Sequence, residues 1–193
     1  MTRKVVESYG AELRIVPVGF KFIGEQIKEM EVSGKGTFLF GFEESIGYLK
    51  GTYCRDKDAV LAAALTAEAA LYYKEKHGKN LYQVMQELYA QFGYYQDRQE
   101  SMQFDGIEGK QKIADILETL QKDQRPEIGG LAVASRQFEG GLFTLEFENC
   151  GFVKVRPSGT EPKIRFYFCI CGESMNQAAA TLDAVRSDVF GAL

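Results

Sequence analysis

The stretch Phe152-Val-Lys-Val-Arg-Pro-Ser-Gly-Thr-Glu-Pro-Lys-Ile-Arg-Phe-Tyr-Phe168 decides the fold of the C-terminal half of the chain. Two runs of alternating apolar residues lie on either side of a short polar segment, residues 156–163. Such alternation predicts two strands that each bury one face. The turn-forming residues between them predict that the two strands pair.

The polar segment also carries the groups that bind phosphate. Hydroxyls and backbone N–H groups in a turn form an anion-binding concavity, and arginine adds a planar fork for phosphate oxygens. Pro157 keeps Arg156 extended, and Gly159 permits a positive φ or a close backbone approach. The candidate phosphate ligands are Arg156, Ser158, Gly159, Thr160, Lys163 and Arg165. Because the same residue types are common in ordinary turns, the segment alone leaves a phosphate site and a charged hairpin turn equally open.

Composition places the chain among soluble globular proteins, with 45% hydrophobic and 26% charged residues. The net charge of −4 gives no reason to expect nucleic acid or an anionic membrane as a partner. No apolar run reaches the roughly 18 residues of a membrane-spanning helix, and no signal-peptide core follows the N-terminus, so we expect a cytoplasmic protein. A single histidine, His77, and four cysteines without CxxC spacing indicate no metal site.

The order of expected elements changes near residue 92. Strands and helices alternate over residues 1–92, which predicts an α/β domain. Residues 93–193 predict an α+β domain with a small antiparallel sheet backed by helices. Expected helices cover 2–9, a segment from about 20 to 30, 58–76, 81–92, 107–122 and a segment from 174. Expected strands cover 12–16, 37–42, 94–104, 142–148, 152–156 and 164–171, and residues 131–140 have only a weak pattern.

Two features of the first domain bear on its structure. The helix over 58–76 is expected to turn one apolar stripe to the core, and Glu68 falls inside that stripe, where it would need a partner or a route to water. The stripe consists of Val60, Leu61, Ala64, Leu65, Ala67, Leu71 and Tyr72. Asp58 is expected to cap this helix and Asn80 the next one.

Glu43-Glu-Ser45 follows the strand over 37–42, which is expected to be buried on both faces. In α/β sheets ligands gather at the carboxyl ends of strands. Glu43 and Ser45 share a face by alternation, and a carboxylate can accept hydrogen bonds from two neighbouring sugar hydroxyls. A solvated acidic turn explains the same residues, and the segment taken alone favours that explanation. Asp56-Lys-Asp58 has the spacing of a metal loop, but helix capping accounts better for Asp58.

Three segments occur together and in order: Val18-Gly-Phe-Lys-Phe-Ile-Gly-Glu25, Gly41-Phe-Glu-Glu-Ser-Ile-Gly47 with Arg55-Asp-Lys-Asp58, and Arg156-Pro-Ser-Gly-Thr-Glu-Pro-Lys163. Their combination resembles the C-terminal half of the α-D-phosphohexomutases, in the bacterial phosphoglucomutase/phosphomannomutase branch. The resemblance covers nearly the whole chain. It implies most of the family's third domain, which reads sugar hydroxyls, and the whole fourth domain, which anchors the substrate's phosphate.

Carried over to this chain, the resemblance implies that Glu43, Ser45 and Lys57 contact the sugar and that Gly19 lies in a substrate-facing loop. The family usually has a threonine before that glycine, whereas this chain has Val18, which puts one hydroxyl contact in doubt. Arg156, Ser158, Gly159 and Thr160 would bind the non-reacting phosphate, and Lys163 and Arg165 would assist.

The implied parent activity is an intramolecular phosphotransferase reaction, the reversible 1,6-phosphoryl transfer of a hexose phosphate through a hexose 1,6-bisphosphate. The family's phosphoserine and its aspartate-rich Mg²⁺ loop have no counterpart here, since the serine motif needs a histidine and His77 lies elsewhere. The chain is therefore expected to be an inactive part of a longer enzyme whose N-terminal domains are its partners. It would lack one strand at its start, and the unpaired sheet edge could pair two copies.

Two other interpretations remain open: a stand-alone phosphosugar-binding or regulatory module, and a purely structural partner domain. The chain does not show whether it prefers glucose, mannose or glucosamine phosphate.

Overall fold

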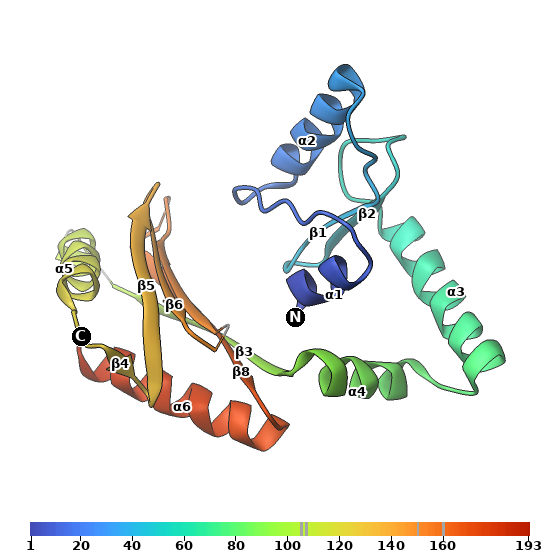
Figure 1. Ribbon diagram of the computed structural model, residues 1–193. Helices are drawn as coiled ribbons and strands as arrows, with labels where there is room; N and C mark the ends of the chain where they lie inside the picture. The colour runs from blue at the N-terminus through green and yellow to red at the C-terminus, as the bar shows by residue number, and fades with distance from the viewer. Residues whose placement is uncertain (105, 107, 150, 160) are drawn as a thin grey trace. The chain divides into compact units, whose positions relative to one another are not determined.

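The computed structural model describes residues 1–104, 106, 108–149, 151–159 and 161–193 (Figure 1). It divides into two compact units, residues 2–88 and residues 89–193, with Met1 grouped with the second. Within the described ranges, no helix is both long enough and apolar enough to cross a membrane. The expected order, an α/β arrangement followed by α+β, is confirmed.

The N-terminal unit is built of helices and a two-stranded antiparallel hairpin. Its elements in chain order are α1 (Thr2–Ser8), α2 (Phe20–Ser33), β1 (Phe40–Glu43), β2 (Gly47–Lys50), α3 (Ala59–His77) and most of α4 (Leu81–Phe92), whose residues 89–92 belong to the second unit. The expected caps are confirmed: Asp58 accepts a hydrogen bond from the backbone N–H of Leu61 at 2.9 Å. Asn80 and Gln83 exchange two such bonds at the start of α4, each 2.9 Å long.

The core of this unit lies between α2 and the hairpin. Phe20, Ile23 and Ile27 recur at helical spacing on α2 and are buried together with Leu49 of β2. A Cβ atom at Gly41 would lie 2.7 Å from Cγ2 of Ile23, well inside the ordinary carbon contact distance of about 3.5–4.0 Å. The glycine therefore allows α2 to pack closely on β1.

The strand predictions for this unit are partly wrong. Residues 12–16 form no strand, and the strand expected over 37–42 begins only at Phe40. It is not buried on both faces, because Phe40 is 47% and Phe42 is 43% exposed. A strand is stabilised by the neighbours that it pairs with. β1 pairs with β2 alone, and residues 12–16 pair with no strand of the described chain.

Helix α3 forms as expected, but it does not bury its apolar stripe. None of its side chains is buried, Val60 is 82% and Leu71 55% exposed, and Glu68 is exposed. Within its unit α3 lies beside β2, and a two-stranded hairpin is too small to cover a helix of 19 residues.

The C-terminal unit is a six-stranded antiparallel sheet with two helices packed on one face (Figure 1). The strand order is β3–β8–β7–β6–β5–β4. The elements are β3 (Tyr94–Gln103), α5 (Glu108–Lys122), β4 (Glu127–Ile128), β5 (Leu131–Glu139), β6 (Leu142–Phe147), β7 (Phe152–Pro157), β8 (Lys163–Gly172) and α6 (Met175–Gly191).

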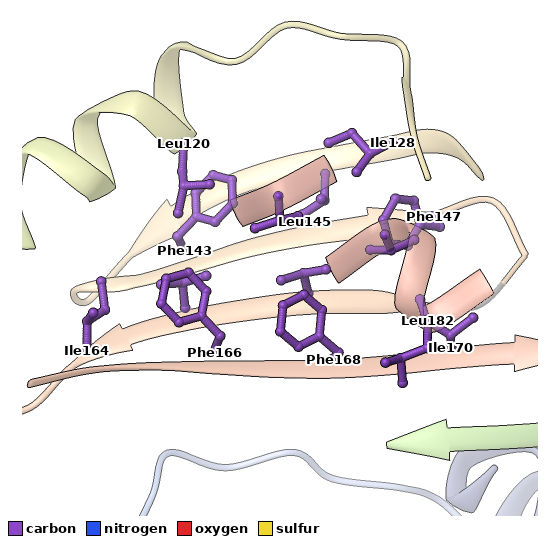
Figure 2. Close-up of a cluster of buried hydrophobic side chains, with 14 of the residues drawn as sticks. Leu120, Ile128, Phe143, Leu145, Phe147, Ile164, Phe166, Phe168, Ile170 and Leu182 are labelled. Carbon is purple, nitrogen blue, oxygen red and sulfur yellow. The ribbon is translucent and has the colours of Figure 1, made fainter. Parts of the chain in front are cut away.

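Alternation along the paired strands builds the core of this unit. Val155 lies opposite Phe166, and Val153 lies opposite Phe168. All four side chains are buried with residues of α5 and α6, and Figure 2 shows Phe166 and Phe168 among the core residues. Their strand neighbours point to the opposite face. We call that opposite face, which carries Lys154, Arg156, Lys163, Arg165 and Tyr167, the outer face.

Helix α6 agrees with its prediction in detail. Ser174 caps it by accepting a hydrogen bond from a backbone N–H of its first turn, and Ala178, Leu182, Val185 and Val189 are buried as expected.

The strands β2, β4 and β5 were not predicted from the sequence. β5 lies within the weakly patterned residues 131–140, and its pairing with β6 shifts between Val133 and Ser135. The shift is a bulge or irregularity, and such an interruption breaks the period-two pattern by which a strand is recognised in a sequence.

Candidate functional site

The segment that the sequence suggests as a phosphate site, residues 158–162, joins β7 to β8, and we call it the phosphate loop. The backbone N–H of Ser158 donates to the carbonyl of Lys163 at 2.7 Å, and the N–H of Lys163 donates to the carbonyl of Glu161 at 2.8 Å. The Ser158 hydroxyl oxygen accepts a hydrogen bond from the N–H of Glu161 at 3.3 Å. These bonds close the loop into a tight turn. Thr160, a candidate ligand from the sequence, lies outside the described residues.

Arg156 and Arg165 stand beside this loop. They face each other in register on β7 and β8, and both are half-buried. Nε of Arg165 is buried and has no hydrogen-bond partner among the described residues. Two guanidinium groups therefore lie on neighbouring strands at the base of the phosphate loop.

Of the two roles expected for Gly159, a positive φ and a close backbone approach, the structure does not show the first. Its φ is not positive, so the loop does not require glycine for its backbone conformation. A Cβ atom at this position would meet no other atom within 4 Å. The space around the exposed Gly159 is therefore open.

A pocket of about 210 Å³ lies beside the loop on the side of α5. The loop lines it with Ser158, Gly159 and Glu161, and α5 adds Lys110 and Ile113. The sequence did not point to Lys110, because it lies 46 positions before Arg156 (156 − 110) and in no motif. Only the packing of α5 beside the hairpin brings it to the loop.

The candidate sugar residues lie in the N-terminal unit, around the turn of the β1–β2 hairpin. Glu43 is the last residue of β1 and faces Gly47 in register. A Cβ atom at Gly47 would lie 2.7 Å from Cδ of Lys57 and 3.1 Å from Oε2 of Glu43. The side chains of Glu43 and Lys57 thus converge above Gly47, and the missing Cβ leaves room for both.

Lys57 is held in place by two further contacts. Its ammonium group donates to the Asp56 carboxylate at 2.7 Å and lies 5.1 Å from the centre of the Phe20 ring. The hydrogen bond with Asp56 raises the pKa of Lys57, and the negative charge of Glu43 adds a smaller contribution. Lys57 in turn lowers the pKa of Asp56. Both groups are thus held in their charged forms.

Gly19 and Ser45 occupy loop positions near these residues in the chain. Gly19 precedes Phe20 as the N-cap of α2, with a φ of 124° that favours glycine. Ser45 is exposed in the hairpin turn. It is followed by Ile46, whose φ of 66° is the one positive value recorded for a non-glycine residue of the described chain. Such a backbone is uncommon for a β-branched residue, and no sequence pattern predicts it.

No metal centre is found among the described residues, where no three His, Cys, Asp or Glu side chains gather in a way that could hold an ion. Asp56 pairs with Lys57 and Asp58 caps α3, so both carboxylates already have partners. The residues present do not fit a Mg²⁺ site.

Residues 1–92 match the family described as phosphoglucomutase/phosphomannomutase, alpha/beta/alpha domain III. Residues 1–92 therefore belong to this family. A phosphoglucomutase of Staphylococcus saprophyticus is 30% identical over 207 residues, which is 95% of this chain and 37% of the relative. Phosphoglucomutases of Staphylococcus haemolyticus (strain JCSC1435) and Staphylococcus aureus (strain MSSA476) are each 29% identical and are matched over 35% and 36% of their lengths.

Those two matches cover 92% and 96% of this chain. The chain therefore spans little more than a third of the length of these relatives. Its match to them runs through both structural units.

Proposed function

We propose that this chain is the sugar-binding and phosphate-binding part of a phosphoglucomutase/phosphomannomutase. The complete enzyme would transfer a phosphoryl group reversibly between O1 and O6 of a hexose phosphate, with a hexose 1,6-bisphosphate as intermediate. Family membership supports the reaction class, and the two side-chain clusters described above support the division of labour. Catalysis of this kind depends on positioning and on charge stabilisation.

The phosphate loop would hold the phosphate that does not react. The observation that carries this proposal is the facing pair Arg156–Arg165 beside the closed loop. Arginine binds phosphate oxygens through two parallel N–H groups, and the Ser158 hydroxyl and the loop backbone would add further hydrogen bonds. Gly159 lets a ligand approach the backbone, Lys163 adds charge at the start of β8, and Thr160 is proposed from the family motif alone.

The hairpin cluster would hold the sugar. The Glu43 carboxylate can accept hydrogen bonds from two hydroxyl groups, while the Lys57 ammonium can donate to an oxygen beside them. Ser45 and the backbone at Gly19 complete the proposed set. Because these groups address hydroxyls of the ring, glucose and mannose phosphates both remain substrates of the proposed enzyme.

The chain alone is proposed to bind hexose phosphates weakly and to convert none of them. Its single histidine, His77, is the last residue of α3 and lies in no serine motif. The phosphorylated serine and the Mg²⁺ loop would be supplied by N-terminal domains of the same enzyme in the cytoplasm. No step assigned to the residues of this chain involves the metal.

The N-terminal unit also offers a surface for those domains. Among the described residues, each strand of its hairpin pairs along one edge only, and α3 buries none of its side chains. A second copy of the chain is the competing occupant, since unpaired edges also allow dimers. Light scattering of the purified chain distinguishes a surface for other domains from a surface for self-association, because a chain that stays monomeric at all concentrations does not pair with itself.

The experiment that tests the proposed function combines binding with turnover. Purified chain is titrated with glucose 1-phosphate and then incubated with it while glucose 6-phosphate is measured. We expect saturable binding without product. Product formation by the chain alone would overturn the assignment of catalysis to other domains, and a lack of any binding would overturn the proposed function.

A further inference from the structure

The pocket beside the phosphate loop contains a cation that the proposed phosphate site does not include. Lys110 reaches this pocket from α5, and the loop lines it with Ser158 and Glu161 among other residues. Arg156 and Arg165 belong to the outer face of the sheet, whereas the pocket lies on the side of α5. The loop therefore has two arginines on one side and Lys110 on the other.

The start of α5 packs closely on the segment that holds the loop. Gly109 is buried, and a Cβ atom there would lie 3.0 Å from both Cβ and the carbonyl oxygen of Phe104, closer than ordinary contacts of about 3.5–4.0 Å. The N–H of Phe104 in turn donates to the carbonyl of Pro162 in the loop at 2.9 Å. These contacts fix the backbone of Lys110, the third residue of α5, beside the loop.

Lys110 lies at the end of α5 where a positive charge is unfavourable. The free N–H groups of a helix's first turn favour anions and disfavour cations, so Glu108 suits this end and Lys110 does not. Lys122, in the last turn, lies at the favourable end and pairs with Glu118. Lys110 has no ion-pair partner among the residues that the structure describes. An anion bound beside Lys110 would offset this unfavourable placement.

We propose that Lys110 is a further substrate-binding residue, whose ammonium group contacts the phosphate in the phosphate loop from the side of α5. This inference rests on the proposed function, in which the loop holds the phosphate that does not react. Arg156 and Arg165 would bind the same phosphate from the outer face. An ammonium group has three donors and no acceptor, so phosphate oxygens suit it.

The ligand class that Lys110 recognises is the phosphate group and not the sugar carbon that carries it. The loop would hold either phosphate of the substrate while the other reacts. Lys110 should therefore contribute equally to the binding of glucose 1-phosphate and glucose 6-phosphate. Glu161 lines the same pocket, and its carboxylate would repel a phosphate there. Lys110 and Glu161 should thus have opposite effects on affinity, which gives the test a sign.

Calorimetric titration of the 193-residue chain with the two glucose phosphates at low salt tests the inference. Lys110→Gln removes a charge from the pocket, and Lys112→Gln removes the same charge from an exposed position on α5 that does not line it. We expect Lys110→Gln to weaken the binding of both ligands about twofold to fivefold, the range for an exposed ion pair. Lys112→Gln should leave both affinities unchanged, and Lys110→Arg should retain most of the affinity.

Two further results are expected. Glu161→Gln should strengthen binding, because it removes a negative charge and keeps the backbone N–H that donates to Ser158. The difference between Lys110→Gln and the unsubstituted chain should shrink at high salt, which screens exposed charges.

Equal affinities of Lys110→Gln and Lys112→Gln would overturn the inference, and so would weaker binding by Glu161→Gln. Arg156→Ala separates this failure from that of the proposed function. If Arg156→Ala weakens binding and Lys110→Gln does not, the loop site stands and only the role of Lys110 is wrong. An unchanged affinity in Arg156→Ala would overturn the loop site itself.

Discussion

Replacing Gly129 by alanine is expected to push α6 away from the sheet. A Cβ atom at this position would lie 2.3 Å from the backbone nitrogen of Val185 and 2.5 Å from its Cα, where ordinary contacts are about 3.5–4.0 Å. The clash is with helix backbone, so no change of rotamer can relieve it. The N–H of Gly129 also donates to the Asp188 carboxylate of α6 at 2.7 Å, which ties the same two segments together.

The expected loss of folding stability in Gly129→Ala has two parts. Overpacking a buried contact costs about 1–3 kcal/mol, and a left-handed backbone, here with a φ of 58°, costs a non-glycine residue about 1–2 kcal/mol. Gly129→Ala should therefore lower the free energy of unfolding by about 2–5 kcal/mol. Gly140 offers a matched control, because its φ is 57° and a Cβ atom there would meet nothing within 4 Å. Gly140→Ala should cost only the backbone part.

Hydrogen exchange read by mass spectrometry suits this comparison, because peptides from β6, β7 and β8 report on the C-terminal unit alone. We expect core amides of these strands to exchange faster in Gly129→Ala than in Gly140→Ala. The difference should correspond to about 1–3 kcal/mol. Equal protection in the two variants would refute the close packing of α6 against this loop.

Three further predictions concern single groups. Burial raises the pKa of the Cys169 thiol, so Cys169 should be alkylated at pH 8 more slowly than the half-buried Cys54, and equal rates would contradict its burial. The hydrogen-bonded guanidinium of Arg125 lowers the pKa of Asp123. The stability that this pair contributes is present above the ordinary carboxyl pKa of 3.8 and is lost as the pH falls through the pKa of Asp123 in the folded protein. Asp123→Asn should therefore reduce the loss of unfolding free energy at acidic pH, and an unchanged loss would contradict this prediction. Asp58→Ala should lower the stability of the first turn of α3 by about 1 kcal/mol, measured as faster amide exchange, and unchanged exchange would show that the cap contributes nothing.

The C-terminal unit could be predicted closely from its sequence because its strands and helices bury one another. The alternation around Phe166 and the helical spacing around Leu182 describe two halves of one core. In such a unit the period of the apolar residues and the observed burial agree. The exceptions are β4, which has only two residues, and β5, whose pairing shifts near Val133.

The N-terminal unit could be predicted less well, for a physical reason. Val60 and Leu71 belong to the apolar stripe of α3, yet both are exposed. A periodic pattern therefore predicts which face of a helix is apolar, but it does not predict whether another segment packs on that face. Likewise, the run of residues 12–16 has the composition of a strand, yet a strand also needs a partner for its backbone groups.

For the candidate sites, the sequence motifs named Glu43, Lys57, Arg156 and Arg165, and the structure shows the first two converging and the last two facing each other. Lys110 lines the pocket beside the loop because α5 packs next to the hairpin. No local sequence pattern predicts a contact between segments so far apart in the chain.

The central claim is that the loop after β7 binds the phosphate of a sugar phosphate. It is tested most directly by the affinity of the chain for glucose 1-phosphate before and after Arg156→Ala, with Arg3→Ala in the exposed helix α1 as the control. The account predicts a loss of about 1.5–3 kcal/mol for Arg156→Ala, the scale of hydrogen bonds to charged groups, and no change for Arg3→Ala. Equal affinity of the wild-type chain and Arg156→Ala would contradict it.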